Sequence, residues 1–421
     1  MSDPAVIPLA HAADRVPTRY PLRAVLVTEG MLSFAANLLF VGIFFYTTSV
    51  FGWGIVPNFL LATGQGLVYV VAALATQKLS RALGRRTLLV GSNLALTAVS
   101  LGAALTSSQP VIVALVLAYV PLIALNWPVL ETLASEGAEP RELSRRIGVY
   151  NLVWAGTGAL AIAVQGSLLR LDPRAVFLAP AILHLATALI FAFTKSRAAA
   201  NGSGGASPSR DAHAAPHAEP ELLAQRTLAL WLSRISQPAA YVVLYTISAL
   251  MPLLPPMRGL NPAYATLLAS VWLVSRWLAF LLLGATTFWH VRPGLLLWAA
   301  ALMTLAFLGI SVSPSYLRPA WAGADLPMLI GAQVVLGFTL GLIYTASLYF
   351  GMVLSDSSTE HAGYHEALIG AGQVLGPGIG ALTQWRWPTR PLAGVAAVTG
   401  VLLLSLVAAM VAAGRARKRD A

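Results

Sequence analysis

Twelve long apolar segments constrain the fold of this chain more than any other feature of its sequence. Each is close to the ~20 residues that a helix needs to cross the roughly 30 Å hydrocarbon core of a bilayer. They lie near residues 24–47, 56–77, 87–106, 110–132, 147–169, 174–194, 227–252, 263–285, 294–312, 326–351, 367–384 and 391–413. Only 10% of the residues are charged, against about 25% in soluble domains. We therefore expect an all-α membrane protein with 12 transmembrane helices.

The apolar segments fall into two sets of six. Between the sets, residues 195–226 are rich in Ala, Gly, Ser and Pro and have no hydrophobic periodicity, which is typical of a flexible linker. The sequence thus predicts one six-helix bundle over 1–194, a cytoplasmic linker over 195–226 and a second six-helix bundle over 227–421. The first 21 residues lack the apolar core of a signal peptide, so we expect no cleavage.

The basic residues indicate orientation. Most of the 27 Lys and Arg residues fall in connections on the same side as the N-terminus, which predicts cytoplasmic N- and C-termini. The net charge of +11 therefore reflects membrane topology, and we expect no nucleic-acid partner. The absence of cysteine excludes disulfides and thiol chemistry. The Arg-rich, Ala-rich composition favours a bacterial inner (plasma) membrane protein, and we expect a monomer in the lipid bilayer that needs no cofactor.

Two glycine-rich stretches resemble each other across the two sets. Residues 147–160 (IGVYNLVWAGTGAL) and 369–382 (IGAGQVLGPGIGAL) are identical at six of 14 positions, and each opens the fifth segment of its set. Both run in the same direction, which predicts a parallel repeat with a pseudo-two-fold axis along the membrane normal. Glycines allow close helix approach, and Pro377 frees a backbone carbonyl. We interpret 369–382 as a bent helix at a moving contact between the bundles, with a static packing seam as the alternative.

The connection between the second and third segments, QKLSRALGRRTLL (77–89), resembles the signature of the major facilitator superfamily, in which a Gly and an Asp precede Gly-Arg-Arg. The matching positions are Leu79, Gly84, Arg85 and Arg86, while Gln77 and Arg81 stand where the family has its first Gly and its Asp. The resemblance covers almost the whole chain. It implies a transporter whose spans one, four, seven and ten line a central cavity, with Gly84, Arg85 and Arg86 at an inner gate.

A second stretch, GQVLGPGIG (372–380), resembles the Gly-Pro motif of antiporters in this superfamily. Here the motif lies in span eleven, and span five has Ala155 where Pro377 would align. We expect Gly376 and Pro377 to act in gating. The direction of transport stays open.

Polar residues inside the apolar segments are functional candidates, because a charge at the bilayer centre costs roughly 2.5 to 3.5 kcal/mol on insertion scales. In span one, Glu29, Ser33 and Asn37 share one helical face, which either lines a cavity or packs by hydrogen bonds. In span seven, a polar stripe indicates a water-filled cavity. Its members are Arg234, Gln237, Tyr241, Tyr245 and Ser248.

Arg276 lies near the middle of span eight and needs an anionic partner or an anionic substrate. Glu29 and Glu131 could serve as its counter-ion, or a permanent ion pair could fix the packing. Spans four and ten add Tyr119, Asn126, Trp127, Glu131, Gln333, Tyr344 and Ser347. The expected substrate-binding residues are Asn37, Asn126, Gln237, Tyr241, Tyr245, Arg276 and Tyr344, and the expected proton-coupling residues are Glu29 and Glu131.

Histidines give further candidates. His361 and His365 stand four residues apart beside Glu366, which suits a hydrogen-bonded gate, a partial metal site or ordinary surface polarity. We assign Glu366 to gating and expect no metal. His184 in span six is either a packing residue or a proton site.

These observations favour secondary active transport of a small solute by alternating access. No GxxxxGK[ST] loop occurs, so a gradient would supply the energy. Proton coupling is favoured, because a desolvated Glu29 or Glu131 can take up a proton and be reset by Arg276. The solute could be a sugar or an organic anion. Two alternatives are a membrane-embedded enzyme acting on a lipid-linked substrate, and a transporter-like sensor or scaffold that moves no solute. We expect no enzyme activity.

Overall fold

The computed structural model describes residues 18–136, 140–194, 197–198, 220–354, 359–390 and 392–419. Within these ranges the chain is helical apart from one short antiparallel pair, β1 (Thr18–Arg19) with β2 (Arg197–Ala198). The N-terminal stretch 1–17 and most of the predicted linker lie outside the described residues. Helix α9 begins at Pro220, so residues 220–226 of the predicted linker are helical.

Eight helices form the first half of the chain. They are α1 (Leu22–Phe40), α2 (Ile43–Phe51), α3 (Ile55–Leu83), α4 (Arg85–Ala104), α5 (Gln109–Ala124), α6 (Trp127–Ser135), α7 (Pro140–Leu171) and α8 (Ala175–Phe193). Within this half, α1 packs against α7 and α8, α4 against α5 and α8, and α3 against α5. Six predicted spans therefore appear as eight helices, because two spans are interrupted.

The second half contains eight α-helices and four 3-10 turns within the described residues. The α-helices are α9 (Pro220–Leu250), α10 (Pro262–Ala269), α11 (Val271–Ala285), α12 (Gly294–Ser311), α13 (Pro314–Leu317), α14 (Asp325–Leu354), α15 (Thr359–Arg386) and α16 (Ala393–Arg419). The 3-10 turns are η1 (Met251–Leu253), η2 (Pro255–Met257), η3 (Phe288–Val291) and η4 (Pro319–Ala324). Here α14 packs against α9, α11 and α12, while α9 also contacts α12, α15 and α16.

Ten segments of the described chain are long and apolar enough to cross a membrane. They are Leu22–Phe51, Ile55–Thr76, Arg85–Ala104, Gln109–Ser135, Arg145–Leu171, Ala175–Phe193, Pro262–Ala285, Gly294–Ser311, Pro319–Gly351 and Ala393–Ala416. Ten of the 12 predicted spans thus coincide with such a segment. The other two fall on α9 and α15, which have 31 and 28 residues but carry too many polar groups and glycines to qualify.

Three predicted spans are each divided into two helices, at α1–α2, α5–α6 and α10–α11. Between α5 and α6 the cause is Pro128, which has no N–H to give to the carbonyl four residues earlier. Between α1 and α2, the Leu39 carbonyl accepts a hydrogen bond of 3.1 Å from Gln65 Nε2, and the Gly42 carbonyl accepts one of 3.0 Å from Gln165 Nε2. Protein side chains therefore satisfy backbone groups that lipid could not.

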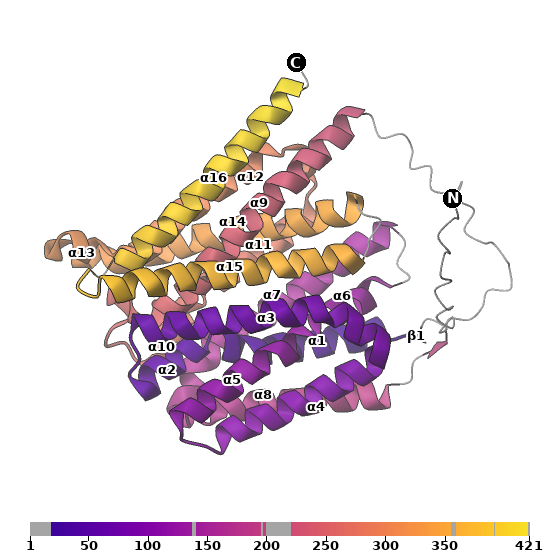
Figure 1. The fold of residues 1–421 in the computed structure, drawn as a ribbon, viewed down its shortest axis with the longest axis horizontal. Helices are drawn as coiled ribbons and strands as arrows, with labels where there is room; N and C mark the ends of the chain where they lie inside the picture. Colours follow the sequence, from indigo (N-terminus) through magenta and orange to yellow (C-terminus); the bar gives the residue numbers. More distant parts are fainter. Residues whose placement is uncertain are drawn as a thin grey trace, which may run out of the picture.

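The two halves meet along α3 and α15, along α7 with α10 and α11, and along α3 with α9. Figure 1 shows α15 lying beside α3, and α7 passing behind them near α10 and α11. The two glycine-rich stretches are therefore placed alike. Each belongs to a fifth segment, α7 or α15, that contacts the other half.

Close approach explains the glycines of α15. A Cβ at Gly372 would clash with the Pro238 carbonyl of α9, and one at Gly380 would lie 2.7 Å from the Phe59 ring of α3. Successive glycines thus contact α9 on one side and α3 on the other, as packing of small residues in membrane helices requires. The predicted close-packed helix between the two halves agrees with this geometry.

Candidate functional site

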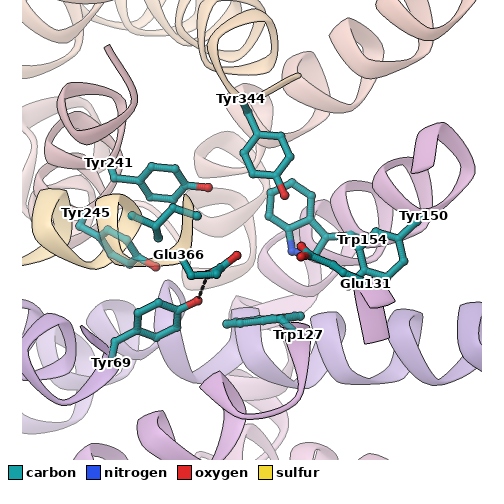
Figure 2. Close-up of a pocket in the computed structure, with 10 residues that line it drawn as sticks. Tyr69, Trp127, Glu131, Tyr150, Trp154, Tyr241, Tyr245, Tyr344 and Glu366 are labelled. Carbon is teal, nitrogen blue, oxygen red and sulfur yellow. Dashed lines mark hydrogen bonds between the residues drawn. The ribbon is translucent and has the colours of Figure 1, made fainter. Parts of the chain in front are cut away.

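A cavity of about 60 Å³ lies between the two halves of the chain. It has room for about four to six water molecules. Helices α3, α6 and α7 supply one wall, and α9, α14 and α15 the other. Its lining residues are Tyr69, Trp127, Glu131, Tyr150, Trp154, Tyr241, Tyr245, Tyr344, Glu366 and Ile369 (Figure 2). Seven of these ten side chains are aromatic and two are carboxylates.

Glu366 joins the two halves at this cavity. The Tyr69 hydroxyl on α3 donates a hydrogen bond to Glu366 Oε2 on α15, drawn as the dashed line in Figure 2. Both side chains are buried, and 297 residues separate them in the chain. The predicted gating role of Glu366 thus falls on a residue that lines the cavity and also contacts the opposite half.

Glu29 lies behind the cavity wall, inside the first half. Its Oε2 accepts a hydrogen bond of 2.7 Å from the Tyr150 hydroxyl, and its Oε1 accepts one of 2.5 Å from Ser33 Oγ. The side chain has no exposed surface. Since Tyr150 lines the cavity, the carboxylate of Glu29 is separated from it by one hydrogen bond.

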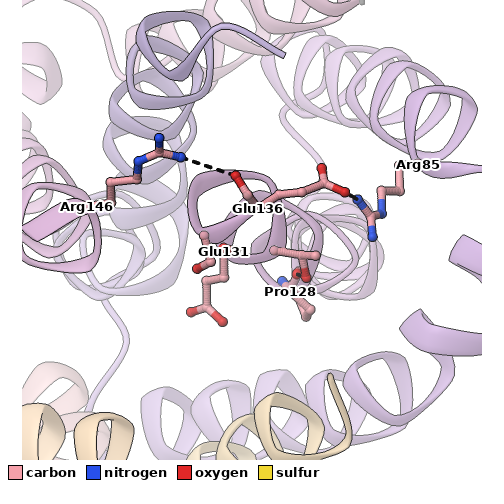
Figure 3. A network of polar contacts seen from close by, with 7 residues as sticks. Arg85, Pro128, Glu131, Glu136 and Arg146 are labelled. Carbon is pink, nitrogen blue, oxygen red and sulfur yellow. Dashed lines mark hydrogen bonds and ion pairs between the residues drawn. The ribbon is translucent and has the colours of Figure 1, made fainter. Parts of the chain in front are cut away.

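Glu131 is different, because its carboxylate lines the cavity without support from the protein. Among the described residues no hydrogen bond or ion pair to its side chain occurs, and Figure 3 shows the side chain extending away from its neighbours. It lies on α6, directly after the break at Pro128. A carboxylate in this position has only water, protons or a ligand as partners.

Arg276 does not pair with a carboxylate of the described chain, in contrast to the prediction of a Glu29 or Glu131 counter-ion. Its guanidinium carbon instead lies 4.5 Å from the ring centroid of Trp154 and 5.1 Å from that of Trp272. The side chain is 5% exposed, and its Nε has no hydrogen-bond partner. Cation–π contact therefore replaces the expected ion pair.

Aromatic rings connect this cation to the cavity. Trp154 stacks on Tyr344 with ring centroids 5.3 Å apart and an angle of 19° between the planes. Tyr241 and Tyr245 stand one turn apart on α9, with centroids 6.1 Å apart. The sequence-predicted tyrosines of spans seven and ten thus do meet at one cavity, together with a tryptophan from α7.

The two ends of the cavity differ. We name them after the helix connections at Gly54 and at Gly84. On the Gly54 side, the Gly166 amide of α7 donates a hydrogen bond of 2.9 Å to Thr266 Oγ1 of α10, which joins the halves. On the Gly84 side, a second cavity of about 20 Å³ shares Glu131 and Tyr150 with the first. Its other lining residues are Ala134, Ser135, Ile147 and Leu348, near the helix ends on that side.

A network of charges holds the connections on the Gly84 side (Figure 3). Arg85 Nη1 pairs with Glu136 Oε1 at 3.1 Å, and Arg146 Nη1 donates to the Glu136 backbone carbonyl at 3.2 Å. Arg86 donates to the carbonyl of Ala192. Glu136, at the end of α6, thus supplies an acid for the Gly-Arg-Arg motif, although Arg81 occupies the motif's acidic position.

Gly84 has a conformational reason to be glycine. Its φ of +80° lies in the region that side chains rarely adopt, and it both ends α3 and begins α4. Of the predicted gating set, Gly84, Arg85 and Arg86 are therefore at one helix connection, whereas Gly376 packs against α9 within the second half and Pro377 lies inside α15.

Four predicted substrate-binding residues do not line the cavity, namely Arg276, described above, and three residues with amide side chains. Asn37 donates a hydrogen bond of 2.8 Å to the Ser33 carbonyl and packs on α7. Asn126 is fully buried and accepts a hydrogen bond of 2.8 Å from Asn93 Nδ2. Gln237 is fully buried, and neither amide atom has a partner. Span one therefore uses its polar face for packing.

His184 belongs to the same buried network as Asn126. Its Nε2 lies 2.8 Å from the Tyr119 hydroxyl, and its Nδ1 lies 3.1 Å from Asn93 Oδ1. Both ring nitrogens are thus occupied, as in the packing interpretation. In α15, His365 Nδ1 hydrogen-bonds with Ser347 Oγ at 3.1 Å, while the side chain of His361 lies outside the described residues.

Sequence reasoning missed four lining residues, which are Tyr69, Tyr150, Trp154 and Ile369. Tyr150 and Trp154 stand four residues apart inside the stretch 147–160, so they share a helical face. From this spacing, the sequence could have predicted that both rings line the cavity. For Tyr69 the sequence offers none, because only its hydrogen bond to Glu366 distinguishes it from other apolar positions of its helix.

The arrangement of many membrane-crossing helices around a central polar cavity defines a multi-pass membrane protein of the transporter class. A family model described as Major Facilitator Superfamily matches residues 24–363. The chain belongs to the Major Facilitator Superfamily.

Solved structures support the same fold. A structure of the nucleoside transporter NupG matches with a TM-score of 0.64 and 13% identity, covering 94% of this chain and 98% of the other. A point mutant of the same transporter matches with a TM-score of 0.65 and 11% identity, covering 94% and 99%. No curated protein matches the chain. The fold is therefore that of a transporter of this superfamily, as the sequence motifs predicted.

Proposed function

We propose that this protein is a secondary active transporter that moves a small solute by alternating access and couples the movement to protons. The observation that carries the proposal is Glu131, a carboxylate without a partner among the described residues, in a cavity whose walls come from both halves of the chain. Such a group can bind a proton or a solute in one conformation and release it when the walls separate.

The proposal includes the arrangement of the helices. The ten apolar segments, together with α9 and α15 as spans seven and eleven, would form 12 membrane helices. They would make two six-helix bundles, residues 1–194 and 227–421, joined by the linker 195–226 and related by a pseudo-two-fold axis. The equivalent contacts of α7 and α15 with the other half support this symmetry.

The proposed setting follows from the charge pattern. The basic side would be cytoplasmic, with both termini inside a bacterial inner membrane and the protein a monomer in the bilayer. The Gly84 side would then be cytoplasmic, because Arg85, Arg86 and Arg146 lie there. The two halves would then be in contact on the outer side, where the Gly166 amide bonds to Thr266.

Proton coupling would use the three carboxyl groups at the cavity. Glu131 would exchange protons directly, while Glu366 and Glu29 accept hydrogen bonds from Tyr69 and Tyr150. Arg276 would influence them only through space, since it makes no ion pair with them. A membrane-embedded enzyme is a weaker candidate, because the described residues that line the cavity include no Ser, Thr, Cys, Lys or His side chain.

The test is transport by purified protein in liposomes. A panel of labelled sugars, nucleosides, amino acids, organic amines and organic acids is offered with and without an inward proton gradient. We expect at least one solute to move faster than in protein-free liposomes, and the gradient to change its rate in the wild type but not in Glu131→Gln. The matched control is Asp172→Asn, which removes an exposed carboxylate outside the cavity.

Two outcomes would contradict the proposal separately. If no solute of the panel moves faster than in protein-free liposomes, the transport function is wrong. If a solute moves at the same rate with and without the gradient, coupling to protons is wrong.

A further inference from the structure

The charge around the cavity is unbalanced. Glu131 and Glu366 line it, and Glu29 lies behind Tyr150. None of the described residues that line the cavity is Lys or Arg. The nearest cation, Arg276, is not part of the lining. Trp154 lines the cavity and also covers the guanidinium group, with its centroid 4.5 Å from the guanidinium carbon.

The aromatic side chains of the lining also favour a positively charged solute. The faces of Tyr and Trp rings carry negative potential and attract cations within about 6 Å of the ring centroid. The same rings offer apolar surface to the body of a ligand. Trp154 and Tyr344 stack beside Glu131, and Tyr241 and Tyr245 face them from α9 (Figure 2).

Other solute classes fit this lining less well. An organic anion would meet two carboxylates and no cation in the wall, although Arg276 suggested such a solute from sequence. A sugar needs several donors and acceptors in fixed positions, but the polar groups of the lining are two carboxylates, five tyrosine hydroxyls and two indole N–H groups. Two of those hydroxyls are already bonded to Glu366 and Glu29.

We propose that the solute is an organic cation, in which an ammonium group contacts Glu131 and an apolar or aromatic body packs against Trp154 and Tyr344. This inference rests on the proposed transport function and names its substrate class. The positive charge would satisfy the Glu131 carboxylate, which has no partner in the part of the chain that the structure describes. Because Trp154 already contacts Arg276 and Tyr344, the rings of Tyr241 and Tyr245 on the facing helix would hold the ammonium group, including quaternary ones that cannot donate hydrogen bonds.

The test uses three probes of nearly the same shape that differ in charge. They are choline, the neutral 3,3-dimethylbutan-1-ol and the anionic 3,3-dimethylbutanoate. Adenosine is added as a neutral solute that can stack on aromatic rings. Binding of each to the purified full-length protein is measured by isothermal titration calorimetry at pH 7.5. We expect the Kd of choline to be at least about 10-fold below that of the neutral alcohol, and no binding of the anion.

Substitutions of single residues test which side chains bind the cation. Glu131→Gln should raise the Kd of choline about 10-fold and leave that of the neutral alcohol unchanged, whereas Asp172→Asn should change neither. Trp154→Leu should weaken both. If Glu131→Gln fails to fold, as judged by aggregation in size-exclusion chromatography, the comparison of the probes on the wild type still tests the proposed cation site.

The inference would be overturned if the alcohol, the anion or adenosine bound as tightly as choline. This result is separable from a failure of the transport proposal. Selective choline binding without any solute flux in liposomes would refute transport while the cation site stands. Flux of an anion or of adenosine without choline binding would refute the cation site while transport stands.

Discussion

Removing the hydroxyl of Tyr69 is the sharpest test of how the two halves are held. Tyr69→Phe deletes the hydrogen bond from α3 to Glu366 of α15 and keeps the ring and its packing. A hydrogen bond to a charged group contributes about 1.5 to 3 kcal/mol. If α3 and α15 separate when the Gly54 side opens, the variant should shift that equilibrium by about 10- to 150-fold towards opening, with 1.4 kcal/mol equal to a factor of 10.

The assay exploits the absence of cysteine in the natural sequence, so that two introduced cysteines are the only labelling sites. Leu171 and Leu317 are suitable positions, because both are exposed and lie on the Gly54 side of opposite halves. Spin labels at these positions report the separation by pulsed electron paramagnetic resonance. We expect a longer-distance population that is larger in Tyr69→Phe than in the parent.

The same distance measurement at lower pH tests this hydrogen bond a second time. Once Glu366 is protonated, it accepts only a neutral hydrogen bond, of about 0.5 to 1.5 kcal/mol. The difference between Tyr69→Phe and the parent should then shrink as the pH falls. The control is Tyr264→Phe, which alters a tyrosine on α10 that is 67% exposed. Superimposable distance distributions in Tyr69→Phe and the parent at all pH values would refute the reasoning.

Three further predictions concern stability, measured as the melting temperature of the purified protein. Gly372→Ala should lower it, because the added Cβ would lie 2.7 Å from a side-chain atom of α9 and overpacking costs about 1 to 3 kcal/mol. The control is Gly331→Ala, which should not lower it, because nothing lies within 4 Å of the added Cβ. Asn126→Ala should lower it by about 1 to 3 kcal/mol, because one buried N–H of Asn93 loses its acceptor while Ser92 keeps the Leu89 carbonyl. Solute affinity should not change, and a changed affinity would place Asn126 in the binding site. Glu136→Gln should have a smaller effect than Asn126→Ala, because its ion pair with Arg85 is partly exposed and such pairs contribute up to about 1 kcal/mol.

Periodicity and length predicted most of the fold. Ten of the predicted spans coincide with apolar helical segments, because length and hydropathy are set by the bilayer and can be read along the chain. The breaks within three spans were not predicted. Pro128 marks one of them in the sequence. At the break between α1 and α2, the side chains that bond to the backbone are Gln65 and Gln165, which lie far along the chain and reach it only after folding.

The candidate site was predicted in part. Tyr241, Tyr245, Tyr344 and Glu131 were expected in a cavity and do line it. Their polarity within apolar helices was sufficient, because few other reasons place such groups there. Arg276 shows where this reasoning fails. A buried cation predicts a partner but does not say which kind, and here two indole rings take the place of a carboxylate.

The two helices that hydropathy does not identify are those that matter most for the proposed movement. α9 and α15 pack against each other and against α3, so much of their surface faces protein or cavity rather than lipid. Such helices can afford Gln237, Glu366 and closely spaced glycines, which lower their mean hydropathy. Low hydropathy in a helix of spanning length therefore indicates extensive contact with other helices and with the cavity. On this argument, a substitution that makes α15 more apolar would improve its insertion but should impair transport.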